Sequence, residues 1–88
     1  MYSDRYSGEL TKKLAKLRKR DPLHYERIDK KMREIIENPL HEYKNLRYNL
    51  SEFKRVQIGH FVLAFRVDHA NKTILFYDYD HHDKIYEK

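Results

Sequence analysis

The chain of 88 residues contains no cysteine. It therefore has no disulfide framework, no thiolate metal site and no thiol nucleophile. Because small secreted domains commonly depend on disulfides, we expect this protein in the cytoplasm. The sequence also lacks an apolar run near the roughly 18 residues that a membrane span needs. Its first residues contain no apolar segment of the kind found in signal peptides, so we expect neither a span nor a secretion signal.

Positive charge exceeds negative charge, with 19 Lys and Arg against 14 Asp and Glu and a net charge of +5. The excess is largest in residues 1–20, which hold seven basic and two acidic residues. Eight Tyr and four Phe argue against disorder and offer aromatic faces. Cations and aromatic faces together suit a polyanion such as RNA, although a solvated basic helix explains the composition equally well. The length predicts one domain over residues 1–88.

Two helices are predicted in the first half of the chain. Ser7 is a suitable N-cap, and leucines follow it at helical spacing at Leu10, Leu14 and Leu17. The Asp21–Pro22 pair ends this helix and begins a second one, which we expect to end before Pro39. The apolar face of the second helix is formed by Tyr25, Ile28, Met32, Ile35 and Ile36. The tight connection predicts an antiparallel helical hairpin.

The second half of the chain is predicted to be strands. Segments 53–58, 60–67 and 73–79 are rich in Phe, Val and Ile, with a turn at Gly59 and a polar hairpin loop over 68–72. A further short strand is predicted over 2–6. The order β-α-α-β-β-β predicts an α+β fold, in which the helical hairpin packs on one face of an antiparallel sheet.

The uncovered face of this sheet is the expected functional surface. Along 53–58 the alternation directs Val56 and Ile58 to the helices, and Arg55 and Gln57 to the other face. Lys54 stands at the start of the strand, where a bend could direct it to the same face. The tail after residue 80 folds back and adds two histidines and a tyrosine. Imidazoles beside cations suit RNA cleavage, which needs a base, an acid and cations that stabilise the phosphorane.

Two adjacent histidines and an aspartate, His81, His82 and Asp83, form the most conspicuous cluster in the tail. Their donor types match a metal-ligand set. However, neighbouring residues on a strand point to opposite faces, so we expect no metal site and only one histidine at the substrate. A solvated strand end is the alternative interpretation. His60 is expected to be a surface residue of the turn that follows Gly59.

Four ordered segments carry a resemblance to a known family: TKKLAKLRKRDP, IDKKMREIIENP, YKNLRYNLSEFKRVQIGHFVLAFRV and FYDYDHHDKIY. Together they resemble the RelE toxins of the RelE/ParE toxin–antitoxin superfamily along nearly the whole chain. The resemblance implies a ribosome-dependent endoribonuclease that cuts mRNA in the A site without a metal or other cofactor. Attack by the 2′-OH would leave a 2′,3′-cyclic phosphate. It also implies a RelB-like antitoxin that wraps around the toxin.

The resemblance assigns roles to individual residues. Arg55 matches a basic residue that binds phosphate or stabilises the transition state, and Lys54 beside it could share that role. His82 lies four residues before Tyr86, where many relatives have Arg or His, and is the favoured acid/base, with His81 as the alternative. Tyr86 matches the family's C-terminal tyrosine, which stacks on a base or assists proton transfer.

Two positions depart from the family pattern. Gln57 and Val62 stand where many relatives have basic residues. An amide can bind RNA but cannot offset phosphorane charge, and valine can do neither. These departures favour two alternatives: a ParE-like toxin that acts on DNA gyrase, or an inactive homologue that only binds its antitoxin.

The basic side of the first helix has three interpretations: contact with RNA of the ribosome, antitoxin docking, or a solvated face. The candidate RNA-binding residues there are Lys12, Lys13, Lys16, Arg18 and Lys19.

Overall fold

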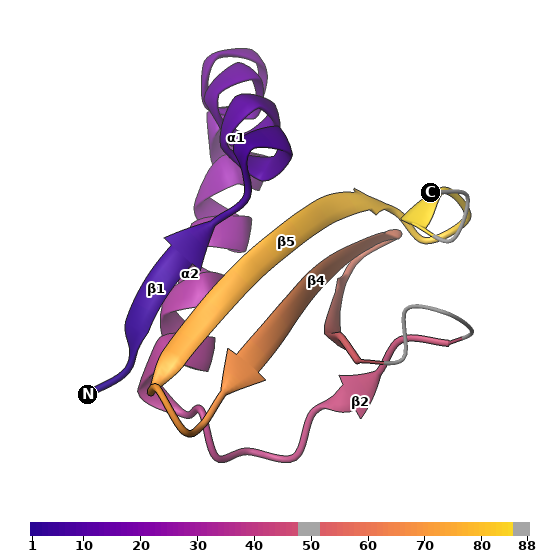
Figure 1. The fold of residues 1–88 in the computed structure, drawn as a ribbon. Coiled ribbons are helices and arrows are strands. Elements are labelled where there is room, and N and C mark those ends of the chain that lie inside the picture. The colour runs from indigo at the N-terminus through magenta and orange to yellow at the C-terminus, as the bar shows by residue number, and fades with distance from the viewer. Residues whose placement is uncertain (48–51, 86–88) are drawn as a thin grey trace.

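Two helices lie against one face of a five-stranded sheet (Figure 1). This computed structural model describes residues 1–47 and 52–85. Along the chain the elements are β1 (Ser3–Tyr6), α1 (Gly8–Arg20), α2 (Pro22–Glu37), β2 (Lys44–Asn45), β3 (Lys54–Ile58), β4 (Phe61–Asp68) and β5 (Thr73–His81). The predicted α+β class, with a helical hairpin on one face of a sheet, is confirmed.

The sheet differs in detail from the expected antiparallel one. Its strand order is β1-β5-β4-β3-β2, and β1 pairs with β5 in parallel. The two-residue strand β2 adds an edge beside β3. Alternation within a strand predicts which face a residue occupies but carries no information about the direction of its partner. The orientation of β1 is therefore a property of the tertiary structure.

The predicted helix boundaries are confirmed by their caps. The Ser7 hydroxyl accepts a hydrogen bond from the Leu10 N–H at 3.1 Å and begins α1. Asp21 ends α1, and its carboxylate accepts the His24 N–H at 3.2 Å to begin α2, with Pro22 in the first turn. Neither of the helices that the structure describes is long and apolar enough to cross a membrane.

The main core lies between the helices and the sheet. Its fully buried members from the sheet include Leu63 and Phe65 of β4 and Ile74 and Phe76 of β5. The helices contribute Leu10, Leu14, Ile28, Met32 and Ile35. The apolar stripes predicted for both helices therefore form this core, which fixes the face of the sheet that remains available for function.

A second, smaller cluster covers part of the opposite face. Val62 and Ala64 alternate with the core residues of β4 and pack with Leu46, Phe53 and Ile85. Ile85 is only 1% exposed, so the tail does fold back onto this face, as the sequence predicted. The cluster also explains Val62: the side chain is buried there and takes no part in a polar surface.

Truncation of Phe65 tests the main core. Phe65→Ala should lower the free energy of unfolding by about 3–5 kcal/mol, because the ring is fully buried between helices and sheet. Urea unfolding followed by circular dichroism measures this change. Leu23→Ala is the control, since Leu23 is 75% exposed and should change stability by less than about 0.5 kcal/mol. Equal effects of the two variants would contradict this description of the core.

Candidate functional site

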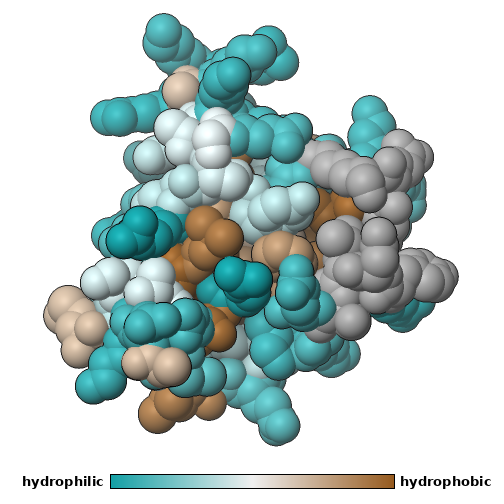
Figure 2. Space-filling view, in the orientation of Figure 1, coloured by the Kyte–Doolittle hydropathy of each residue, from teal (hydrophilic) through white to brown (hydrophobic). Residues whose placement is uncertain are grey.

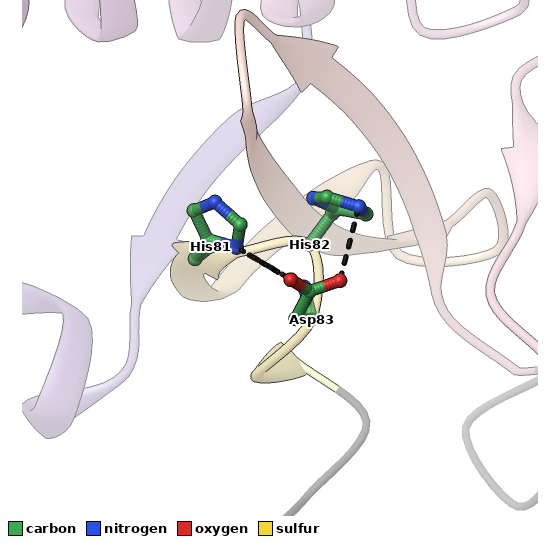
Figure 3. Close-up of side chains that lie close together, drawn as sticks. All are labelled: His81, His82 and Asp83. Atoms are coloured by element: carbon green, nitrogen blue, oxygen red, sulfur yellow. Dashed lines mark hydrogen bonds and ion pairs between the residues drawn. The ribbon is translucent and has the colours of Figure 1, made fainter.

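The end of β5 holds a compact group of polar side chains, shown in Figure 3. His81 is the last residue of β5 and pairs with Phe61, the first residue of β4. The chain then turns, and the His82 N–H donates to the His60 carbonyl at 3.0 Å. The Lys84 N–H donates to the His81 carbonyl at 2.8 Å, which closes the turn. Backbone hydrogen bonds therefore fix the positions of both histidines.

Both imidazoles point toward the Asp83 carboxylate (Figure 3). His82 Nε2 lies 3.1 Å from Asp83 Oδ1, and His81 Nδ1 lies 3.5 Å from Asp83 Oδ2. The centroids of the two rings are 4.8 Å apart. The histidine side chains are 37% and 52% exposed, so a large ligand can reach both.

The expectation that the two histidines point to opposite faces was wrong. Strict alternation holds only inside a strand, and β5 ends at His81. His82 belongs to the turn, where the changed direction of the chain brings its ring to the same carboxylate. A single sequence reveals the spacing of the pair but not the residue at which the strand ends.

His60 is exposed, as expected, but it also borders this group. Its ring stacks at 6.2 Å from the His81 ring, centroid to centroid. Its carbonyl oxygen lies 3.3 Å from His82 Nδ1, in addition to accepting the His82 N–H. Because a carbonyl only accepts hydrogen bonds, His82 Nδ1 must donate, and the other ring nitrogen is left facing Asp83.

The cations of β3 lie away from the histidines. Arg55 is opposite Ala64 and therefore shares the face predicted for it, and its Nε donates to the Asn45 carbonyl at 3.3 Å. Lys54 is opposite Phe65, on the helix side of the sheet, and its Nζ donates to Asn45 Oδ1 at 2.7 Å. The bend that would have brought Lys54 to the face of Arg55 is absent from β3 as the structure describes it.

Gln57 lies on the predicted face, opposite Val62 in the sheet. Its amide nitrogen donates to the Gly59 carbonyl at 2.9 Å. Gly59 itself has a positive φ of 63°, a conformation that favours glycine and permits the turn between β3 and β4. Tyr86, the expected stacking residue, lies outside the described residues.

Lys13 connects α1 to the edge of β5 that β1 leaves uncovered. Its Nζ lies 2.8 Å from Asp78 Oδ1 and 3.2 Å from Asp80 Oδ2, and it donates to the Tyr79 carbonyl at 3.1 Å. Asp78 is only 1% exposed, and Lys13 supplies a cation next to this buried carboxyl group. The sequence predicted Lys13 as an RNA contact and did not reveal its pairing with Asp78 and Asp80. The available signal was the alternation of these two carboxylates within an otherwise apolar strand.

The other basic residues of α1 remain exposed. Hydrophilic side chains gather where α1 lies, at the top of the space-filling view (Figure 2). The Arg18 guanidinium stands over the Tyr25 ring at 5.8 Å. Lys16 and Arg20 line a groove whose floor includes Phe61, and the Phe61 ring contacts His81 at 5.6 Å between centroids. The basic helix and the histidines thus border the same aromatic side chain.

Tyr79 anchors the start of α2 beside this groove. Its hydroxyl contacts His24 Nε2, and its ring stacks on Phe61 with centroids 5.0 Å apart. Burial raises the pKa of Tyr79 well above its usual value, so the hydroxyl stays neutral and acts structurally. His24 received no role from the sequence, and here it positions the helix.

The fold is that of a small α+β protein with an exposed histidine cluster, and comparison with known proteins identifies its family. A family model described as the ParE toxin of type II toxin–antitoxin systems, parDE, matches residues 4–86. The chain is 54% identical over 89 residues to "Putative toxin RelE4" of Methanocaldococcus jannaschii, covering 100% of this chain and 94% of the relative. The chain therefore belongs to the RelE/ParE superfamily of type II toxin–antitoxin toxins.

Solved structures share its fold. The toxin–antitoxin complex RelBE2 of Mycobacterium tuberculosis matches with a TM-score of 0.75 at 23% identity, covering 91% of this chain and 96% of that one. The isolated Escherichia coli RelE toxin matches with a TM-score of 0.75 at 18% identity, covering 92% and 84%. At these identities the likeness establishes the fold alone.

Loss of the Lys13 contact should destabilise the protein. Lys13→Met removes the ammonium group next to the buried Asp78 carboxyl group, and we expect a loss of about 1–3 kcal/mol in the free energy of unfolding. Urea unfolding measures it. Lys12→Met is the matched control, because Lys12 is exposed on the same helix and should change stability by less than about 0.5 kcal/mol. If both variants unfold at the same urea concentration, the ion pair has no structural importance.

Proposed function

We propose that this toxin is a ribosome-dependent endoribonuclease that cuts mRNA in the A site. The observation that carries the proposal is the pair of exposed imidazoles held on one carboxylate at the end of β5. RNA cleavage through the 2′-OH needs a base and an acid close together, and histidine serves both roles near neutral pH. Membership of a superfamily that includes RelE supports this assignment.

In the proposed reaction, His82 exchanges protons with the substrate. One imidazole removes the 2′-OH proton, and the 2′-oxygen attacks the neighbouring phosphorus. The bond from phosphorus to the 5′-oxygen breaks, and the second imidazole protonates that oxygen. The products are a 2′,3′-cyclic phosphate and a free 5′-OH. Asp83 and the His60 carbonyl orient the His82 ring, and His81 supplies the second imidazole.

The cations bind the RNA backbone around this point. Arg55 lies three residues before the end of β3. At roughly 3.3 Å per residue this separation is about 10 Å along the strand, so we assign Arg55 to a phosphate next to the scissile one. Gln57 extends this contact along the same face of β3, whereas Lys54 lies on the helix side and is not assigned to it. On α1 the contacts with RNA, including that of the ribosome, are assigned to Lys12, Lys16, Arg18 and Lys19, because Lys13 is engaged by Asp78 and Asp80. Tyr86 is proposed to stack on a base.

The proposed partner is a RelB-like antitoxin. Support comes from the similar structure of Mycobacterium tuberculosis, which is a toxin–antitoxin complex, RelBE2. A protein that acts on ribosome-bound mRNA would work in the cytoplasm.

A second candidate function, ParE-like inhibition of DNA gyrase without nuclease activity, is favoured by one observation. Val62, where many RelE relatives have a basic residue, is buried under the tail with Ile85. That part of the sheet face cannot contribute charge to a transition state. If the protein is nevertheless a nuclease, Arg55 must provide the charge that stabilises the phosphate in the transition state.

Primer extension on mRNA held in programmed ribosomes tests the nuclease. Wild-type protein should cut in the A site with and without EDTA. His82→Ala should lower the cleavage rate by about 10²–10⁴-fold, because it removes a general acid or base. Arg55→Ala should lower it by about 10²-fold through lost charge stabilisation. His41→Ala is the matched control, since His41 is exposed and distant in sequence from the cluster, and it should cleave like the wild type.

Absence of cleavage by folded wild-type protein would overturn the proposal. Inhibition of gyrase supercoiling by the same preparation would then establish the second candidate. Cleavage that survives both His82→Ala and His81→Ala would place the chemistry outside the histidine cluster.

A further inference from the structure

The donor atoms of His81, His82 and Asp83 are arranged at nearly the spacing of metal ligands. One ring nitrogen from each histidine and a carboxylate oxygen all lie within 4.8 Å of one another. The two nitrogen–oxygen separations are 3.1 and 3.5 Å. In a tetrahedral zinc site with bonds of about 2.0–2.2 Å, adjacent donor atoms are about 3.4 Å apart. Only the two imidazole nitrogens must approach each other, and both side chains are partly exposed.

Hydrogen bonds also help to orient the two rings beside Asp83. The His60 carbonyl requires a hydrogen on His82 Nδ1, so the lone pair of a neutral His82 ring is on Nε2, facing Asp83 Oδ1. His81 Nδ1 accepts the Asp83 N–H at 3.3 Å, a long hydrogen bond that a metal ion on Nδ1 would have to replace. Either a proton or a metal ion between the ring nitrogens and the carboxylate would offset the repulsion between these acceptors.

We propose that His81 Nδ1, His82 Nε2 and an Asp83 carboxylate oxygen bind a divalent first-row transition metal ion, with Zn²⁺ as the reference ion. Two imidazoles and a carboxylate form an established set of three protein ligands, with water at the fourth position. The hydrogen bond from His82 Nδ1 to a backbone carbonyl is the outer contact that fixes ligating imidazoles in metal sites.

Bound metal would inhibit RNA cleavage. The metal ion would bind the His82 lone pair that proton transfer needs. It would therefore inhibit the metal-free cleavage reaction. This consequence rests on the proposed function, whereas metal binding itself does not.

Titration of Zn²⁺ into untagged protein, followed by calorimetry, tests the binding. We expect one Zn²⁺ per chain. His82→Ala and Asp83→Asn should each weaken binding by about tenfold or more, in the range seen when metal-site residues are altered. His41→Ala is the control and should bind like the wild type. Co²⁺ in place of Zn²⁺ adds a visible absorption spectrum that reports nitrogen and oxygen ligands in tetrahedral geometry.

Two results would overturn the site. One is wild-type protein that binds no Zn²⁺, and the other is binding that Asp83→Asn and His82→Ala leave unchanged. Either result would show that these three side chains do not form a metal site. Circular dichroism of the variants shows whether they are folded, which is expected because all three side chains lie at the surface.

The ribosomal cleavage assay separates the inhibitory consequence from the proposed function. Cleavage without added metal, lost at Zn²⁺ concentrations that saturate the protein and restored by EDTA, supports both. Cleavage that continues with the site saturated overturns the inhibition but keeps the nuclease. No cleavage under any condition overturns the nuclease and the inhibition together, while the calorimetric result decides the metal site independently.

Discussion

The antiparallel pairing of β4 with β5 is the constraint on which the rest of the structure depends. It extends from Phe61 opposite His81 to Asp68 opposite Thr73, with a shift between Ala64 and Phe65. Because side chains alternate between faces, a slip of one residue would exchange the main core with the opposite face. The same register brings the turn before β4 against the end of β5. The His60 carbonyl can therefore orient His82, which is 22 residues away in the sequence.

The uncovered edge of β5 is a second constraint. β1 pairs with β5 only over residues 73–76, so the last part of the strand would present unpaired backbone groups. α1 covers this part through Lys13, whose ammonium group contacts two carboxylates and a carbonyl oxygen of β5. One cation of the basic helix is thus structural, and its neighbours remain available to a polyanion.

The two faces of the sheet differ in composition and role. The helix side holds most of the apolar side chains and supplies stability. The other side holds a small cluster closed by Ile85, with Arg55 and Gln57 on the same face and the histidine turn at the far end of β5. The roles that we propose for His81, His82 and Asp83 are proton transfer in the free protein and metal binding when an ion is present. A carboxylate between two imidazoles suits both proposed roles, since it attracts a protonated imidazole as well as a metal ion.

The sequence by itself determined the local features. Ser7, Asp21 and Pro22 set the helix boundaries, and the apolar periodicities predicted the core faces and the α+β class. These depend on interactions between residues close in sequence. Alternation also placed Arg55 and Gln57 on the correct face.

Only the tertiary structure decided the rest. The parallel direction of β1, the engagement of Lys13 by Asp78 and Asp80, and the position of Lys54 on the helix side all depend on which strand or helix lies alongside. The convergence of His81 and His82 on Asp83 depends on the residue at which β5 ends, and pairing with β4 sets that point. Contacts between distant residues are fixed by packing and register, for which a single sequence carries no periodic signal.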